Sequence, residues 1–541
     1  MYGADLPYTV YDQKHWWSDD WDPLQYGQTY DFERPFFEQF RILMRRVPLV
    51  ALANVNAVNS EWCNPAADNK NTYLSFGATK NENVNYSNRI ASCRDSFDLY
   101  LGDKNELCSD SLFLKGCSRV HFSMYARNCL DSLFLFDCNN CTNCISCVGL
   151  RSKQFHIFNE PYTKEEYVKK IEEFKLGSRS ALQNLQDKFF ALVGKYPHRY
   201  AHMINAVRST GDNLENVKNA IACFDIISGM ENSKYCVWGG YGWKDSYDGL
   251  GCNGELMYEL IDGGSVGRVC SNAYFSIAVT DIIDVQYSYS ARGSNNLFGC
   301  IGLRSKSYCI LNKQYTKEEY EKLVPRIIEH MNSMPYVDSK GRIYKYGEFF
   351  PPELSPFSYN ETIAQEYFPL SKEEALAKGY SWKDPEPRNY EITLKTEAIP
   401  DHITGVTDSI LNEIIQCAHY YDIRVNPRFD QRESASTCNE QCTTAFRIIP
   451  QELEFYRKMN LPLPRLCPNC RHYQRIKQRN PLKLWQRKCT CAGAQSENGI
   501  YKNTAAHRHG QNHCPEEFET SYAPERMEIV YCEACYQSEV V

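Results

Sequence analysis

The chain has 541 residues, which is too long for a single hydrophobic core, so we expect two to four domains. Its formal net charge of −7 excludes a protein that binds nucleic acid over its whole surface, and charge has to be examined region by region. The 38 Tyr and 26 Phe favour β structure with half-buried aromatic faces.

The N-terminus lacks the basic and apolar regions of a signal peptide, and no apolar run approaches the roughly 20 residues of a membrane helix. We therefore expect a cytoplasmic protein that does not enter a membrane. In a reducing compartment the 25 cysteines favour metal ligands and buried thiols over disulfides.

Residues 1–60 form an aromatic, acidic segment with one predicted helix. The stretch DFERPFFEQFRILMRRVP has Pro35 near the first helical turn and Pro48 after the last.

Residues 61–177 predict a first β-solenoid of parallel β-helix type. Short pieces such as CRDSFDLYL and CSDSLFL recur without a helical period. Cys93, Cys117 and Cys141 are 24 residues apart, about the length of one coil in which small or polar residues stack in ladders. The alternative is a multi-domain α+β chain with β-sandwich units.

A duplicated stretch ends this unit and a second one. From Cys147 to Lys169, 15 of 23 positions are identical to the stretch that starts at Cys300. Both copies contain a T-x-x-E capping box, which predicts a helix that covers the last coil.

The remaining boundaries follow from composition. Residues 178–215 predict a helical bridge, and residues 216–335 a second β-solenoid with its helical cap. Residues 336–430 form a connector rich in Pro and aromatic residues, with a short helix between Ser371 and Gly379 and another helix over residues 407–423. Residues 431–541 form a cysteine-dense tail.

The tail predicts two structural zinc sites. Cys438-x3-Cys442 precedes Cys467-Pro-Asn-Cys470 by 24 residues, and four thiolates on two knuckles complete a tetrahedral shell. The second set is Cys489, Cys491, Cys532 and Cys535. In the intervening HRHGQNHC, the side chains His507, His509, His513 and Cys514 could replace a ligand, hold a third ion or form a solvated loop.

The stretch FRIIPQELEFYRKMNLPLPRLCPNCR resembles a zinc-ribbon domain of treble-clef type, although the first cysteine pair of that domain is usually C-x2-C. The whole chain resembles uncharacterised cysteine-rich repeat proteins of metagenomic bacteria, through YTKEEY, LWQRKCTC and FETSYAPERMEIVYCEACY. This resemblance implies a zinc-bearing tail and no particular activity.

The same tail concentrates positive charge. Residues 447–508 contain 13 Lys and Arg against 3 Glu, a net charge of +10, whereas the part after Cys514 has 7 Glu and one Arg. Cations interleaved with aromatics beside zinc knuckles are typical of contact with RNA, for example on the ribosome. The candidate nucleic-acid residues are Arg471, Arg475, Lys477, Arg479, Lys483, Trp485, Arg487 and Lys488. Alternatively, these cations pair with acidic groups of the protein itself.

Cysteines at every third position, Cys138, Cys141, Cys144 and Cys147, have part of the spacing of an iron–sulfur motif. In the second copy three of them correspond to Ala291, Ser294 and Leu297. We therefore favour small buried side chains in a ladder over an iron–sulfur cluster.

The leading hypothesis is a non-enzymatic zinc-binding scaffold whose basic tail contacts RNA, with no small-molecule substrate identified. A self-assembling structural protein, a homo-oligomer of stacked solenoids, is the second hypothesis. A carbohydrate-active β-helix enzyme is the third, and it would use carboxylates such as those of Asp245, Asp248, Asp281 and Asp284 with Arg292.

Overall fold

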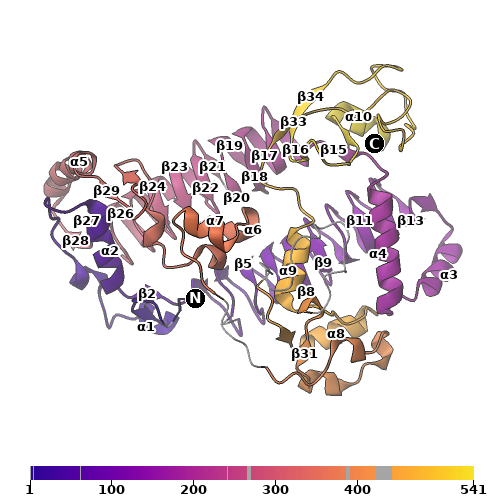
Figure 1. The fold of residues 1–541 in the computed structure, drawn as a ribbon, viewed down its shortest axis with the longest axis horizontal. Coiled ribbons are helices and arrows are strands. Elements are labelled where there is room, and N and C mark those ends of the chain that lie inside the picture. Colours follow the sequence, from indigo (N-terminus) through magenta and orange to yellow (C-terminus); the bar gives the residue numbers. More distant parts are fainter. Residues whose placement is uncertain are drawn as a thin grey trace.

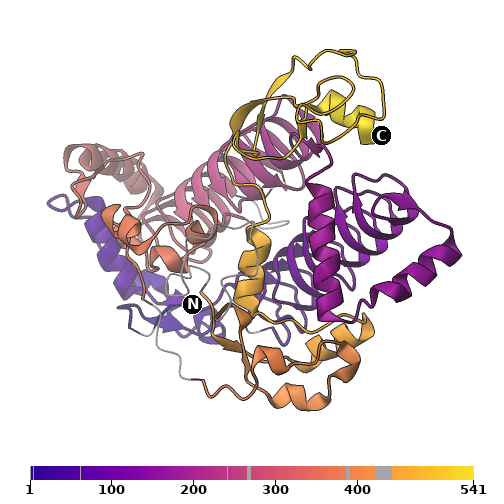
Figure 2. The same ribbon diagram turned by 45° about the vertical axis from the view of Figure 1, so that its right-hand side comes forward.

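The computed structural model describes the whole chain except residues 1, 4, 61, 240–241, 265–269, 385–389, 421–440 and 541. It is mainly β, with two long stacks of parallel strands that meet near helix α9 (Pro468–Ile476) (Figure 1). The turned view in Figure 2 shows the same helix between the two stacks, and it packs against strands of the first. Among the described residues no helix has the length and apolar character needed to cross a bilayer.

The first stack is a solenoid in which equivalent positions of successive coils, such as Asn71 and Asn83, are 12 residues apart. Phe97 pairs in register with Ser109, Ser109 with His121, and His121 with Leu133. The strands are parallel, which excludes the β-sandwich alternative for this unit. The strands are β3 (Asn54–Val55), β4 (Ala66–Ala67), β5 (Phe76–Thr79), β6 (Glu82–Asn85), β7 (Asn88–Ala91), β8 (Arg94–Asp103), β9 (Ser109–Leu112), β10 (Ser118–His121), β11 (Leu130–Phe136), β12 (Thr142–Val148), β13 (Gln154–Ile157) and β14 (Glu160–Pro161).

The coil is half as long as the cysteine spacing predicts, because Cys93, Cys117 and Cys141 lie two coils apart in one interior column. Asn105 occupies the coil between the first two of them, and its side-chain oxygen accepts a hydrogen bond from the Cys117 amide at 3.0 Å. An Asn at this place hides the shorter period in the cysteine spacing.

Each coil consists of triplets. From Lys80 to Phe113, every third residue has a positive φ, as at Asn83, Asp95 and Asp98. Asn and Asp tolerate this left-handed conformation better than other non-Gly residues, which explains why they recur here. The residue after each corner is buried inside the solenoid, so neighbouring interior columns are three residues apart along the chain and the members of one column are 12 residues apart.

Polar ladders connect the corners of successive coils. The Asn59 amide donates to Asn71 at 3.0 Å, Asn71 to Asn83 at 3.0 Å, and Asn83 to Asp95 at 2.7 Å. The constant step of 12 residues therefore places Asn and Asp side chains above one another in successive coils, which is the predicted stacking of polar residues.

The second stack is a less regular solenoid. Side chains that bond between its coils are 12 residues apart near its end, as in Asn272 and Asp284, but 13 residues apart near its start, as in Asn219 and Asn232. A longer step leads from Gly254 to its register partner Cys270. Its strands are β16 (Met203–Val207), β17 (Gly211–Ile221), β18 (Cys223–Ile226), β19 (Met230–Lys234), β20 (Val237–Gly239), β21 (Trp243–Lys244), β22 (Tyr247–Leu250), β23 (Gly254–Ile261), β24 (Cys270–Ile277), β25 (Thr280–Gln286), β26 (Arg292–Phe298), β27 (Ser307–Ile310) and β28 (Lys313–Gln314).

The duplicated stretch closes both solenoids in the same way. Helices α3 (Lys164–Phe174) and α5 (Lys317–Ser333) follow the last strands, and Thr163 and Thr316 form the predicted capping boxes with Glu166 and Glu319.

An asparagine before each capping helix forms hydrogen bonds with a backbone N–H and C=O of the last coil. The Asn312 side chain accepts from the Ile301 amide and donates to the Ile301 carbonyl, both at 2.8 Å. Asn159 makes the same pair of bonds with Val148 at 2.8 Å. The side-chain amide thus replaces the peptide group of a further strand.

Residues outside the solenoids cover their faces. Helix α2 (Phe36–Arg46), predicted in the N-terminal segment, packs Phe36 between Tyr287 and Phe298 of the second solenoid. The other helices are α1 (Gln13–Trp17), α4 (Arg179–Val193), α6 (Ala364–Tyr367), α7 (Lys372–Ala377), α8 (Pro450–Lys458) and α10 (Glu533–Val540), with 3₁₀ turns η1 (Pro23–Tyr26), η2 (Pro352–Leu354), η3 (Tyr359–Glu361), η4 (Thr396–Ala398), η5 (Ile403–Gly405), η6 (Asp408–Asn412) and η7 (Ala418–Tyr420).

Short strand pairs tie the remaining segments together. They join β1 (Val10–Tyr11) to β2 (Leu49–Val50), β15 (His198–Arg199) to β35 (Val530–Tyr531), β29 (Tyr336–Val337) to β30 (Ile343–Tyr344), β31 (Ile415–Gln416) to β32 (Ala445–Phe446), and β33 (Trp485–Lys488) to β34 (Glu517–Thr520).

Three expectations about segments differ from the structure. The first solenoid already begins at Asn54, before residue 61. The bridge is helical only to Val193, with strand β15 from His198 and the strands of the second solenoid from Met203. The helix expected over residues 407–423 is wrong for the described residues, because η6 and β31 replace it and β31 pairs with β32. The short helix after Ser371, in contrast, is confirmed as α7.

Replacing Asn312 by Gly tests the asparagine closure, since Gly keeps the left-handed backbone (φ 61°) but removes the side-chain amide. The buried N–H and C=O of Ile301 would lose these partners, so we expect the free energy of unfolding to fall by about 2–3 kcal/mol in urea titrations. The matched control is Asn296→Gly, because Asn296 has φ 53° and, within the described part of the chain, its side chain bonds only the neighbouring Asn295 side chain at 2.9 Å. Equal losses for the two variants would contradict the closure.

Candidate metal centres

Three groups of Cys and His side chains in the described part of the chain have ligand atoms that all lie within 4.8 Å of one another, and all three involve the tail. They are Cys417, Cys442, Cys467 and Cys470; Cys489, Cys514, Cys532 and Cys535; and Cys491, His507, His509 and Cys535. Each group could hold a metal ion.

The first centre joins the connector to helix α9. The β31–β32 pair brings Cys417, which follows β31, beside Cys442, which precedes β32. Cys467 is the N-cap residue of α9, and Cys470 lies in its first turn. Pro468 at the first helical position fixes this start, because proline needs no amide partner there.

The sulfurs of this centre lie close together and accept hydrogen bonds from backbone amides. The Cys417 and Cys470 sulfurs lie 3.9 Å apart, and the Cys467 amide donates to the Cys417 sulfur at 3.2 Å. The Thr444 amide donates to the Cys442 sulfur at 3.4 Å. Hydrogen bonds with Cys417 lower the pKa of Cys467 and raise the pKa values of Cys442 and Cys470, so one sulfur of the group ionises ahead of its neighbours. Thiolate, rather than thiol, is the form that binds metal.

The second centre connects two distant parts of the tail. Cys489 follows β33, Cys532 follows β35, and Cys535 lies in α10. The Cys514 and Cys532 sulfurs are 3.9 Å apart, and the Cys532 amide donates to the Cys489 sulfur at 3.2 Å. A hydrogen bond with Cys489 lowers the pKa of Cys532 to about 2.

The ligand sets differ from the predicted ones at two places. Cys438 lies outside the described residues, and Cys417 completes the first described group. Cys514 stands with Cys489, Cys532 and Cys535, whereas Cys491 stands with the two histidines. His513 is exposed and belongs to none of the described groups.

Sequence reasoning missed Cys417 because its surroundings, EIIQCAHYY, have the apolar content of a helix. The signal available in the sequence was His419, two residues after Cys417. In the structure its Nδ1 lies 3.3 Å from the Cys470 sulfur.

The cysteines inside the first solenoid behave as core residues. Cys138, Cys141, Cys144 and Cys147 are 0–1% exposed, and their thiols donate to backbone carbonyls, as from Cys138 to Cys147 at 3.5 Å. Burial raises the pKa of the Cys138 thiol. These four do not form one of the described groups with converging ligand atoms. The geometry matches the expectation of small buried side chains in columns.

The basic segment beside the first centre is directed inward. Arg471 lies 2.8 Å from Glu452 and 3.3 Å from Asp98. Arg475 lies 2.9 Å from Asp98 and 3.2 Å from Asp110. Both arginines are buried against strands of the first solenoid.

Arg479, just beyond α9, reaches the second solenoid. Its guanidinium lies 3.1 Å from Asp225 in β18 and donates to the Tyr100 hydroxyl at 2.8 Å. Arg89 of the first solenoid approaches the same Asp225 at 3.8 Å. Three of the eight predicted nucleic-acid residues thus bind acidic groups of the protein from buried positions, which is the alternative interpretation of this charge.

The rest of the predicted nucleic-acid set is exposed or half-buried. Lys488 pairs with Glu517 at 3.2 Å, and Lys483 lies over the Trp485 ring at 5.0 Å. Arg487 donates to the carbonyls of Ala523 and Glu528. Lys477 is exposed at the end of α9.

The aspartates considered for a carbohydrate-active site occupy coil corners. Asp245, Asp248, Asp281 and Asp284 have φ between 47° and 57°. Asn232 donates to Asp245 at 2.9 Å, and Asn272 donates to Asp284. Arg292 lies over the Trp17 ring at 5.5 Å. Asp245 and Asp284 therefore belong to structural ladders.

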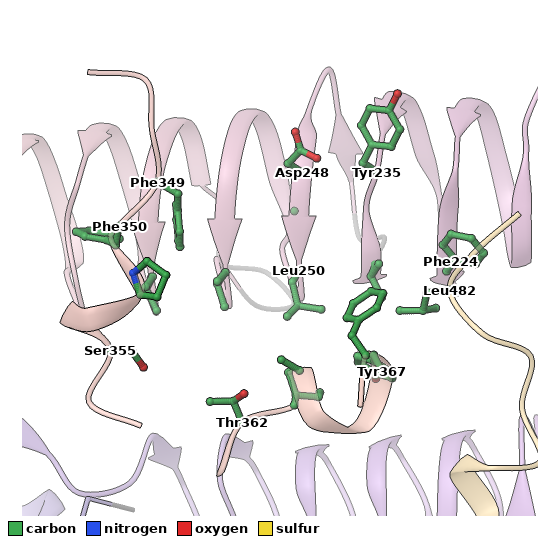
Figure 3. A pocket seen from close by; sticks show the side chains of 18 of the residues that line it. Phe224, Tyr235, Asp248, Leu250, Phe349, Phe350, Ser355, Thr362, Tyr367 and Leu482 are labelled. Carbon is green, nitrogen blue, oxygen red and sulfur yellow. The ribbon is translucent and has the colours of Figure 1, made fainter. Parts of the chain in front are cut away.

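A cavity of about 1070 Å³ lies between the second solenoid, the connector and the tail. Its walls are mainly apolar, with Phe224 and Leu250 on the solenoid, Phe350 and Tyr367 on the connector and Leu482 on the tail (Figure 3). The charged residues of the lining are Asp248, Lys483 and Glu519. Burial raises the pKa of Asp248.

Metal content of cysteine variants checks the first ligand set. Cys417→Ser removes one of the four described sulfurs, so we expect the purified protein to lose one metal ion per chain by elemental analysis. Cys438→Ser should leave the content unchanged, because four described thiols already complete the shell. Loss of metal from Cys438→Ser but not from Cys417→Ser would show that the predicted pair was right.

No family model and no curated protein matches this chain, so the resemblance to cysteine-rich repeat proteins stays a prediction.

Proposed function

We propose that this chain is a non-enzymatic zinc-binding scaffold protein, in which the first metal centre holds α9 as a clamp between two solenoids. One observation carries the proposal. The segment that starts at the metal ligand Cys467 buries Arg471 and Arg475 on the first solenoid and Arg479 on Asp225 of the second.

Zinc is the metal that this ligand set favours. Four cysteine sulfurs within 4.8 Å of one another suit a tetrahedral Zn²⁺ site, and soft thiolates disfavour Mg²⁺ or Ca²⁺. Four protein ligands leave no open coordination position, so the ion would supply structure rather than catalysis.

The clamp needs accurate positions because its charges are buried. Removing one partner of a buried ion pair costs about 3–5 kcal/mol, since the other charge stays unpaired in a medium of low dielectric constant. A metal that fixes the first turn of α9 fixes the origin of all three arginine side chains.

Direct contacts between the solenoids support the same role. Glu215 of the second solenoid lies 2.8 Å from Lys115 and 2.9 Å from Arg127 of the first. The rings of Tyr125 and His202 stack at 3.5 Å. The two solenoids therefore form one frame, with the metal-bearing tail across it.

Contact with RNA or a ribosome stays a prediction, and Lys477, Lys483 and Lys488 are its exposed candidates. Assembly of several copies also stays a prediction.

Substitution of the candidate ligand Cys467, which should remove the metal, tests whether the first centre holds α9 in place. We expect Cys467→Ser to release the first turn of α9 and weaken the buried ion pairs, so amide protection in α9 should fall by at least about 100-fold in hydrogen exchange. Small-angle scattering should show a larger radius of gyration. The matched control is Cys300→Ser, because Cys300 is buried in the second solenoid and its thiol donates to the Cys309 carbonyl at 3.3 Å, as a hydroxyl could. Unchanged amide protection in α9 of the metal-free Cys467→Ser protein would contradict the proposal.

The cavity favours a second candidate function, the binding of an elongated apolar small molecule such as a fatty acid. A volume of about 1070 Å³ is at the upper end of ligand pockets, and apolar walls with few polar groups are typical of them. Apolar walls would also not satisfy the many hydroxyls of a sugar.

Filling the cavity tests this second function. Leu250→Trp places a larger side chain in the space that Leu250 faces in Figure 3, so we expect a fluorescent fatty acid to bind at least about ten-fold more weakly. Ile283→Trp is the control, since Ile283 is 55% exposed on β25 and is not part of the lining. Equal affinities for both variants, or no binding by the unaltered protein, would exclude the function.

A further inference from the structure

Two of the three ligand groups meet at one residue. Cys535 belongs both to the four-cysteine group with Cys489, Cys514 and Cys532 and to the group with Cys491, His507 and His509. All ligand atoms within each group lie within 4.8 Å of one another. The two groups therefore occupy neighbouring volumes with a single sulfur between them.

We propose that the end of the tail holds a binuclear metal centre, in which the Cys535 thiolate bridges two ions of the zinc class. The inference extends the proposed metal-bearing scaffold, because it makes the tail hold three ions instead of two. Two four-coordinate ions that share one ligand need seven ligands, and the two groups together supply seven side chains.

Charge also favours the shared arrangement. Four thiolates around one divalent ion leave a net charge of −2 in a buried site. Five thiolates and two neutral imidazoles around two divalent ions leave −1. Cys489, Cys491, Cys514, Cys532 and Cys535 are all buried, so the smaller excess charge has the smaller desolvation cost.

His507 supplies independent evidence for a ligand. Its side chain is 1% exposed, and its Nδ1 has no hydrogen-bond partner among the described residues. Its Nε2 lies 2.8 Å from the Glu539 carboxylate. A neutral imidazole that donates from Nε2 presents a lone pair on Nδ1. A buried lone pair without a donor is costly, and a metal ion would satisfy it.

Glu539 holds this histidine in place. Its carboxylate also accepts hydrogen bonds from the Tyr501 hydroxyl at 2.9 Å and from the amide and hydroxyl of Thr504 at 2.8 and 2.9 Å. A carboxylate on the outer nitrogen of a metal-binding histidine fixes its ring orientation and raises its basicity.

The other two ligands of this group are oriented in the same manner. The Nδ1 of His509 lies 2.6 Å from the Asn512 carbonyl, so Nε2 keeps its lone pair and faces the Cys535 sulfur at 3.3 Å. The Cys491 sulfur accepts a hydrogen bond from the Asn503 amide at 3.2 Å, and Tyr531 donates to the Asn503 oxygen at 2.7 Å. Each ligand has a partner outside the group.

Metal counting on the full chain, loaded with zinc and freed of loosely bound ions, tests the proposal. We expect three zinc ions per chain by elemental analysis. His507→Ala, or the gentler His509→Gln, should lower the number from three to two. His513→Ala is the matched control from the same loop, because His513 is exposed and outside the groups, and it should keep three.

Cobalt reports the bridge itself. Two Co²⁺ ions joined by the Cys535 thiolate should couple magnetically, so the electron paramagnetic resonance signal per cobalt should fall when the third ion binds. His507→Ala should restore the full signal per cobalt ion. Three ions without this loss would overturn the shared thiolate.

The outcomes separate this inference from the scaffold proposal. A stoichiometry of two in the unaltered protein, with no change in His507→Ala, would mean that His509 only hydrogen-bonds to a mononuclear four-cysteine site. It would overturn the binuclear centre and leave the first centre intact. A protein that binds no zinc would overturn both.

Discussion

The arrangement of the whole chain depends on the pairing of buried charges between the tail and the two solenoids. Asp98 and Asp225 are 1% and 2% exposed, and each faces guanidinium groups from other segments. A buried carboxylate is tolerated only when it is paired with a cation, and a buried cation is tolerated only when it is paired with a carboxylate. Asp98 of the first solenoid depends on the arginines of α9, and Asp225 of the second depends on Arg479 just beyond this helix and on Arg89.

Local chemistry made parts of this fold predictable from sequence. Thr163 with Glu166, Thr316 with Glu319 and Ser371 with Glu374 each fix a helix start over a short stretch of chain, and all three are present. The parallel solenoids followed from recurrent small and polar residues. The coil length did not, because the interior column through Cys93 contains Asn105, and a mixed column hides its period.

The metal centres show where sequence reasoning ends. The CPNC and YCEAC knuckles are local, so the sequence indicates Cys467, Cys470, Cys532 and Cys535 as candidate ligands, and the structure places them in groups that could hold a metal ion. Cys417 joins its group through strand pairing, which spacing does not encode, whereas Cys514 is one of the predicted replacement ligands in the loop before Cys532. Likewise, charge density revealed a basic segment, but only the packed structure shows that Arg475 is buried and neutralised within the chain.

Because of the asparagine closures and the 12-residue coil, the length of each solenoid can change only by whole coils. Asn159 and Asn312 can close any whole number of coils, because each bonds the peptide groups of the coil beneath it; Asn312 also donates to the Pro23 carbonyl at 3.1 Å. One added coil in the first solenoid would nevertheless move everything beyond it by one strand spacing, about 4.8 Å. An ion pair such as Arg475 with Asp98 would not survive a displacement of that size. The numbers of coils in the two solenoids are therefore matched to each other through the helix between them, and neither could change alone.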